Sequence, residues 1–180
     1  MAHVVTGKVR LSYPNLFKAK AFGNSTDAKY SASFLIPKSD TATVAKIKAA
    51  IEEAKEDGKS SKWKGRIPAN LRSPLRDGDA ERAADHPEYA GMWFINATSG
   101  NAPKLYDKDH SEILDSEDLY PGCWVRADIN FNAYSFNGNN GVGAYISSVM
   151  KWKDAERFAG YAASASAYDD DYEDDDEDLM

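Results

Sequence analysis

The sequence predicts a mainly β protein: a small β-barrel with one amphipathic helix, followed by a disordered acidic C-terminal tail. Short runs of alternating apolar and polar residues, bounded by Pro, Gly and Asn, recur as far as Trp152. One stretch, 41–57, instead has the periodicity of a helix. Nine of the 29 acidic residues lie in 169–178, where repulsion between like charges opposes packing.

The first two strands are expected at 4–13 and 29–36, where apolar and polar residues alternate. Pro14 should end the first strand and Pro37 the second, because proline cannot donate to a strand ladder. Between them, 17–26 has two lysines, two phenylalanines and no periodicity, and we expect it to form a loop.

The one helix is expected over 41–57. Asp40 is a suitable N-cap, and Gly58 stands where a helix commonly ends. A single apolar stripe is formed by Val44, Ile47, Ile51 and Ala54. This stripe indicates a helix that packs one side against the core of the protein.

A basic segment, 59–76, follows the helix with six Lys or Arg, no acidic residue and no periodicity. We expect an extended loop here. Basic residues around Trp63 suit a nucleic-acid backbone with one base stacked on the indole. The alternative is a solvated loop in which Trp63 is a packing anchor.

Three further elements are expected before the C-terminal hairpin. The run 91–98 alternates as a third strand, and 102–106 is a short extended piece. The acidic segment 107–119 is expected to hold one short helix.

An aromatic hairpin is expected from alternation over 123–134, turn residues at 137–141 and a returning strand over 142–152. Cys123 falls on the apolar face and is expected to be a small core residue.

The other face of this hairpin is unusual for a solvated surface. It carries Trp124, Tyr134 and, just beyond, Phe136, beside Arg126 and several amides. Flat rings next to a guanidinium can stack and hold unpaired bases. The alternative is that both faces of the hairpin are buried.

Motif searches favour a binding protein over an enzyme. A single cysteine excludes an internal disulfide and a multi-cysteine zinc site, and it suits a reducing cytoplasm. Phosphate-binding glycine loops, zinc-protease motifs and a Ser/His/Asp order are absent, and we expect no cofactor and no metal. A rival metal-dependent nuclease would need Asp77, Asp79, Asp107, Asp109 and His110. Neither a membrane span nor a signal peptide is expected.

The net charge of −7 is concentrated in the tail. Without its nine acids the rest of the chain has 20 acids against 22 bases. The segment 160–168 is built from small residues and reads as a flexible linker. We therefore expect one folded domain over 1–158 and a linker with an acidic tail over 159–180.

Five blocks of the chain carry a resemblance to known proteins, namely 8–17, 30–40, 73–79, 91–107 and 120–154. Together these blocks resemble a family of phage-encoded single-stranded-DNA-binding proteins. This resemblance implies an OB-fold barrel that binds single-stranded DNA (ssDNA) in phage replication or recombination. The tail resembles the acidic tails through which such proteins recruit replication and repair enzymes. It ends in Leu179-Met180 and lacks a terminal aromatic residue.

The DNA-contacting residues follow from the physical argument, with bases on rings and phosphates on Lys and Arg. The candidates are Arg10, Lys62, Trp63, Lys64, Arg66, Arg72, Arg76, Tyr106, Trp124, Arg126, Tyr134 and Phe136. The expected partner-binding residues are Asp174, Asp175, Asp176, Glu177, Asp178, Leu179 and Met180. Weak duplex or RNA binding and homo-oligomerisation stay open, as does an alternative in which the acidic tail makes this an adaptor or chaperone-like protein.

Overall fold

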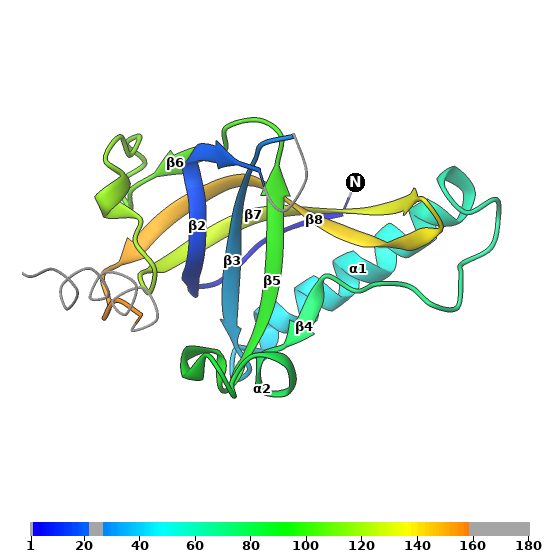
Figure 1. Ribbon diagram of the computed structural model, residues 1–180, viewed down its shortest axis with the longest axis horizontal. Coiled ribbons are helices and arrows are strands. Elements are labelled where there is room, and N and C mark those ends of the chain that lie inside the picture. The colour runs from blue at the N-terminus through cyan, green and yellow to red at the C-terminus, as the bar shows by residue number, and fades with distance from the viewer. Residues whose placement is uncertain (1, 22–26, 159–180) are drawn as a thin grey trace, which may run out of the picture.

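A ring of five strands forms the centre of the computed structural model, which describes residues 2–21 and 27–158 (Figure 1). These strands are β2 (Val9–Lys20), β3 (Lys29–Pro37), β5 (Met92–Ser99), β7 (Trp124–Phe136) and β8 (Asn139–Lys153). They pair in the order β2–β3–β5–β8–β7, and β7 returns to β2. Only β5 and β8 are parallel among these pairs. The ring is the small barrel that the sequence predicts.

Short elements extend this ring. Strand β1 (Ala2–Val5) pairs with β7, β4 (Leu75–Asp77) with β5, and β6 (Lys104–Tyr106) with β8. The short helix α2 (Gly78–Glu81) and the 3-10 helix η1 (Pro87–Tyr89) lie between β4 and β5 in the chain. A second 3-10 helix, η2 (Ser116–Asp118), is the short helix expected in the acidic segment.

The single first strand expected over 4–13 is wrong, because the chain forms β1 and β2 with a break at residues 6–8. A Cβ at Gly7 would lie 2.7 Å from the Asp40 carboxylate, so the break brings the backbone against the start of the helix. The expected stop at Pro14 is also wrong. Strand β2 continues to Lys20 because a register shift between Ser12 and Asn15 accommodates the proline.

Helix α1 (Thr41–Ser61) starts as predicted, since the Asp40 side chain accepts a hydrogen bond from the Thr43 backbone N–H. Its end differs from the prediction, because Gly58 lies inside the helix. A Cβ on Gly58 would lie 2.3 Å from the Cβ of Ala133, a distance no packed pair tolerates. The glycine therefore serves close contact between α1 and β7 rather than helix termination.

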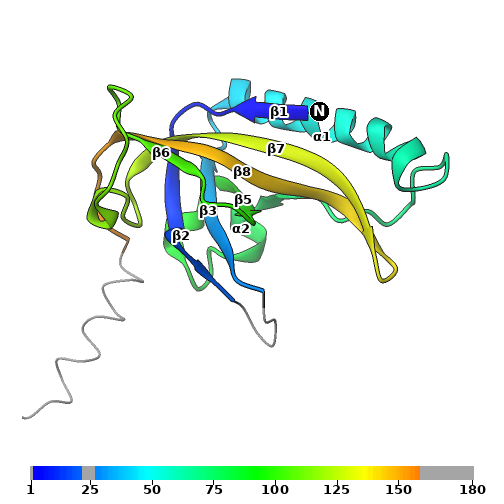
Figure 2. The ribbon, with the colours of Figure 1, turned by 90° about the horizontal axis from the view of Figure 1, so that it is seen from above.

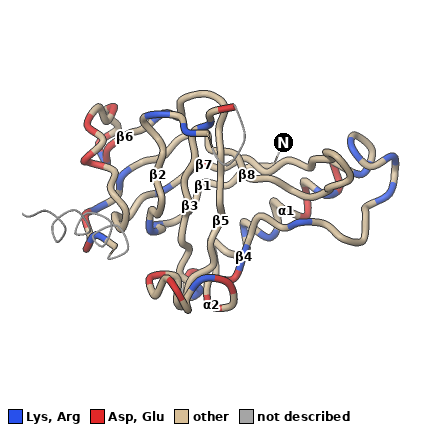
Figure 3. Tube along the Cα trace, in the orientation of Figure 1, with Lys and Arg blue, Asp and Glu red and all other residues tan. Residues whose placement is uncertain are grey.

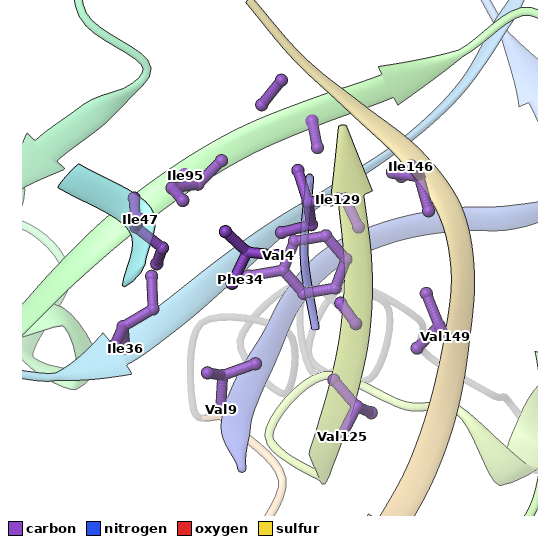
Figure 4. Close-up of a cluster of buried hydrophobic side chains, with 14 of the residues drawn as sticks. Val4, Val9, Phe34, Ile36, Ile47, Ile95, Val125, Ile129, Ile146 and Val149 are labelled. Atoms are coloured by element: carbon purple, nitrogen blue, oxygen red, sulfur yellow. The ribbon is translucent and has the colours of Figure 1, made fainter. Parts of the chain in front are cut away.

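The core lies inside the ring and under α1. Side chains from β2, β3, β5, β7 and β8 meet there, and Ile47 of α1 joins them (Figure 4). Full burial of each Ile, Val or Phe contributes about 1.5–3 kcal/mol of transfer free energy. Cys123 is buried in the same cluster as expected, and burial raises the pKa of its thiol to about 11.

A second, smaller cluster lies on the outside of the ring. Leu35, Tyr89, Phe94 and Phe158 form it. Leu35 belongs to β3 and Phe94 to β5, so one end of the outer surface of these two strands is covered by η1 and the end of the described chain. The other end of this surface carries the candidate site.

The β7–β8 hairpin projects beyond the ring as an arm, with α1 running alongside it (Figures 1 and 2). The expected turn at 137–141 is shorter than predicted, since only Asn137 and Gly138 separate the strands. Both have positive φ, 50° and 80°, as a two-residue hairpin turn of type I′ requires.

Candidate nucleic-acid interface

A row of polar side chains crosses the outer surface of four strands. Ser31 of β3 pairs with Asn15 of β2 on one side and with Thr98 of β5 on the other. Thr98 in turn pairs with Tyr145 of β8. Paired residues point to the same face of a sheet, so the row is continuous. A cleft of about 370 Å³, here called the strand cleft, lies along it. Its lining residues are Tyr13, Asn15, Lys20, Ser31, Ala32, Ser33, Arg82, Asn96, Ala97 and Thr98.

Two arginines lie beside this cleft. The guanidinium of Arg82 is 5.5 Å from the Tyr89 ring and 5.3 Å from the Phe94 ring, and that of Arg76 is 5.5 Å from the Phe94 ring. Arg76 also pairs with Glu81. Sequence reasoning missed Arg82, because it stands in an acidic, alanine-rich stretch and its aromatic neighbours come from η1 and β5.

The strand cleft leads to a group of rings on the arm, here called the hairpin tip and defined as Arg72, Tyr134, Phe136 and Tyr145. A Cβ on Gly141 would lie 2.8 Å from the Tyr134 hydroxyl, and one on Gly143 would lie 2.6 Å from the Tyr145 hydroxyl. The two glycines therefore make room for the tyrosine rings. Phe136 is 70% exposed. Burial raises the pKa of Tyr145, which stays protonated as a hydrogen-bond donor at neutral pH.

Backbone hydrogen bonds hold the basic loop against the hairpin tip. The Arg72 N–H donates to the Asn140 carbonyl over 3.0 Å, and the Val142 N–H donates to the Arg72 carbonyl over 3.0 Å. The Arg72 guanidinium lies 3.3 Å from the Asn139 side-chain oxygen. Arg72 is therefore fixed beside the rings.

The rest of the loop adds positive charge at the same end of the molecule (Figure 3). Lys62, Lys64 and Arg66 are exposed, and they form no ion pair within residues 2–21 and 27–158. The rings and the polar strands thus share one outer surface, and the uncompensated cations lie at its hairpin end. Such a surface can stack unpaired bases and neutralise phosphates.

Comparisons with known proteins identify the family of this chain. The model of the family described as "Enterobacter phage Enc34, ssDNA-binding protein" matches residues 2–180. The chain belongs to this family. One relative of the chain, the putative protein p50 of Acyrthosiphon pisum secondary endosymbiont phage 1, is 32% identical over 169 residues, which cover 90% of each protein.

Solved structures show the same fold. The ssDNA-binding protein of bacteriophage Enc34, in its complex with ssDNA, matches with a TM-score of 0.78 and 31% identity over 87% of this chain and 89% of that one. The ssDNA-binding protein gp2.5 of bacteriophage T7 matches with a TM-score of 0.61 and 15% identity, over 87% of this chain and 94% of its own. The T7 match supports the fold alone.

One of the aromatic rings expected to stack a base is not exposed at the protein surface. Trp63 is only 7% exposed, its ring lies against Gly58, and its Nε1–H donates to the Tyr134 carbonyl over 3.3 Å. Trp63 is therefore a packing anchor, as in the alternative interpretation of the basic loop, and not a stacking ring. An indole buried in this way has no free face on which a base could stack.

The remaining candidates lie at the other end of β7, so the single site expected from sequence is divided. Arg10, Tyr106, Trp124 and Arg126 form this second group. The Arg10 guanidinium donates to the Gly122 and Glu156 carbonyls over 2.6 and 3.0 Å. It also lies 5.2 Å from the Trp124 ring, and burial lowers its pKa. These contacts make Arg10 a structural residue.

The carboxylates considered for a metal are engaged by protein groups. Asp77 and Asp79 accept hydrogen bonds from Lys38 over 2.7 and 2.8 Å, and these bonds lower the pKa of both carboxyls. Asp107 accepts backbone N–H groups of its own loop. In the described part of the chain, no three His, Cys, Asp or Glu residues are grouped to hold a metal ion. The same part has no helix long and apolar enough to cross a membrane.

Proposed function

We propose that this protein binds ssDNA, without catalysing a reaction and largely without sequence preference, in phage DNA replication, recombination and repair in the host cytoplasm. One observation carries the proposal: the strand cleft opens onto the hairpin tip through the Thr98–Tyr145 pair, next to the uncompensated cations of the basic loop. Family membership and the likeness to the Enc34 protein in its ssDNA complex support it.

In this proposal the strand runs from the cleft to the end of the arm. Bases stack on Tyr145, Tyr134 and Phe136, while the Ser, Asn and Thr side chains of the cleft donate and accept hydrogen bonds. Phosphates meet the cations of the loop and cleft, namely Lys62, Lys64, Arg66, Arg72, Arg76 and Arg82. Rings bind any base through its flat face, so little sequence preference is expected.

The test is a titration of full-length protein against ssDNA, duplex DNA and RNA of equal length at several salt concentrations. If the six named cations contact phosphates, log K should fall with log salt at a slope of roughly −4.2, because each contact on a single strand contributes about −0.7. A control variant, Lys46→Ala on the exposed side of α1, should keep this slope. A slope near zero for the wild type would rule out the basic loop as a phosphate contact.

Duplex DNA is expected to bind more weakly than ssDNA, whereas RNA stays open as a ligand. Stacking and phosphate contacts do not distinguish the two sugars, and discrimination needs a group that reads the 2′-hydroxyl. A duplex presents phosphates but keeps its bases stacked inside. The three ligands therefore separate the contribution of the rings from that of the charges.

The acidic tail, which lies outside the described residues, is proposed to have two roles. Its nine acids can compete with DNA for the cations of the basic loop, at an effective concentration on the order of millimolar across the linker. Asp174 to Asp178 with Leu179 and Met180 are proposed to bind replication and recombination proteins once DNA displaces the tail. A pull-down of host replication proteins with and without ssDNA tests this recruitment, and equal recovery in both conditions would contradict the exchange.

A further inference from the structure

A second surface of rings and cations lies on the outside of β6, β7 and β8. Tyr106 of β6 pairs with Met150 of β8, which pairs with Arg126 of β7, so these three side chains form one outward row. Next to this row, the Trp152 ring lies 4.2 Å from the Lys108 ammonium and 5.9 Å from the Arg126 guanidinium.

Trp124 continues this surface at the end of β7. The ammonium of Lys8 lies 5.4 Å from its ring. We call this surface the β7 platform and define it by Lys8, Tyr106, Lys108, Trp124, Arg126 and Trp152. Arg10 is left out, because its Nε and one terminal nitrogen both donate to protein carbonyls. Arg126 stays in, because only its Nε donates to a protein carbonyl, that of Thr6 over 2.8 Å.

The core does not explain these rings. The neighbouring ladder row, Leu105, Val149 and Ala127, points inward and supplies the buried side chains. None of the three platform rings belongs to either hydrophobic cluster formed by the described residues. The two tryptophans instead lie beside the cations Lys8, Lys108 and Arg126 on the outward face, an arrangement that suits a ligand with flat rings and negative charge.

We propose that the β7 platform is a second contact surface for ssDNA, which stacks bases on Trp152 and Trp124 and binds phosphates through Lys8, Lys108 and Arg126. This inference rests on the proposed function, since the same strand would first occupy the hairpin tip. Tyr145 and Trp152 are seven residue steps apart along β8, or about 23 Å at 3.3 Å per step. That length corresponds to roughly seven nucleotides at 3.4 Å each.

The two surfaces are separate contacts rather than one groove. Asp128 lies on the same outer face of β7 between them, with His3 3.8 Å away. Its carboxylate repels phosphate, so the strand should cross this part without a backbone contact. Length dependence is therefore the signature of the platform: an oligonucleotide must be long enough to pass Asp128 before the second surface adds to binding.

The experiment measures fluorescence anisotropy of full-length protein with labelled ssDNA of about 6 and about 20 nucleotides. Trp152→Ala should weaken binding of the longer oligonucleotide about 5- to 150-fold, the effect of one lost stacked base. It should leave the shorter one unchanged, because about 6 nucleotides bound at the hairpin tip do not reach past Asp128 to the platform. Trp152→Phe keeps a ring and should restore most of the affinity.

A second variant avoids the packing of the indole. In Lys8→Ala/Lys108→Ala, two exposed cations are lost, and the salt slope of the longer ligand should become shallower by about 1.4. Lys46→Ala, which removes one exposed cation of α1 outside the platform, is the control. The inference would be overturned if both platform variants bound the longer ligand with wild-type affinity and salt slope. It would also be overturned if the variants lost as much affinity for a duplex, because the bases of a duplex cannot stack on a ring. Phe136→Ala tests the hairpin tip and should weaken binding of both oligonucleotides. This variant therefore tests the proposed function separately from the platform.

Discussion

Substitution of Gly141 by alanine tests whether the contact between the basic loop and the arm shapes the hairpin tip. A Cβ at this position would lie 2.6 Å from the Arg72 carbonyl oxygen and 2.8 Å from the Tyr134 hydroxyl. The carbonyl cannot retreat freely, because it accepts the Val142 N–H over 3.0 Å. The added methyl group must therefore displace the loop, the tyrosine ring, or both.

The expected size of the effect follows from these contacts. Overpacking by one methyl group costs about 1–3 kcal/mol of unfolding free energy. For a domain of this size, each 1 kcal/mol corresponds to about 2–4 °C in Tm, so Tm should fall by roughly 2–12 °C. Displacement of the Tyr134 ring should also lower affinity for ssDNA at least about fivefold, the smaller end of the loss for one stacked base.

The assay pairs thermal unfolding with an ssDNA titration of the folded protein. Gly100→Ala is the matched control, because its Cβ would meet no atom within 4 Å. Gly141→Ala should lower both Tm and affinity relative to this control. If the two alanine variants have the same Tm and bind ssDNA like the wild type, the contact between the basic loop and the arm does not shape the hairpin tip. That result would refute the reasoning.

Three further predictions concern single features of the chain. Phe136→Ala should weaken ssDNA binding by about 1–3 kcal/mol with little change in Tm, because the ring is exposed. Trp63→Ala should instead lower Tm, because it removes a buried anchor. A lower Tm for Phe136→Ala and weaker binding without a change in Tm for Trp63→Ala would exchange the two roles. Deletion of 169–180 should tighten ssDNA binding, most at low salt where screening is weakest, and equal affinities at two salt concentrations would remove competition by the tail. The Cys123 thiol, with a pKa of about 11, should resist iodoacetamide at pH 8 in the folded protein and react after denaturation, so rapid labelling of native protein would contradict its burial.

Local patterns predicted the elements whose causes are local. Alternation over 123–134 identified both faces of β7, and Asp40 caps α1 as its position suggested. Errors arose where a residue has a partner far away in the chain. Gly58 was expected to end the helix but packs against Ala133. Trp63 was expected at the surface, but its ring N–H donates a hydrogen bond to the Tyr134 carbonyl. A single sequence without its fold does not show those partners.

The sequence by itself determined that Trp124, Arg126 and Tyr134 share one face of one strand, because side chains alternate with a period of two residues. It could not determine whether they share one site. Trp124 and Tyr134 are ten residue steps apart along β7, or about 33 Å at 3.3 Å per step, so the two belong to different surfaces. Only closure of the ring, which pairs Thr98 with Tyr145, joins the strand cleft to the hairpin tip and so decides which rings and cations can meet one strand of DNA.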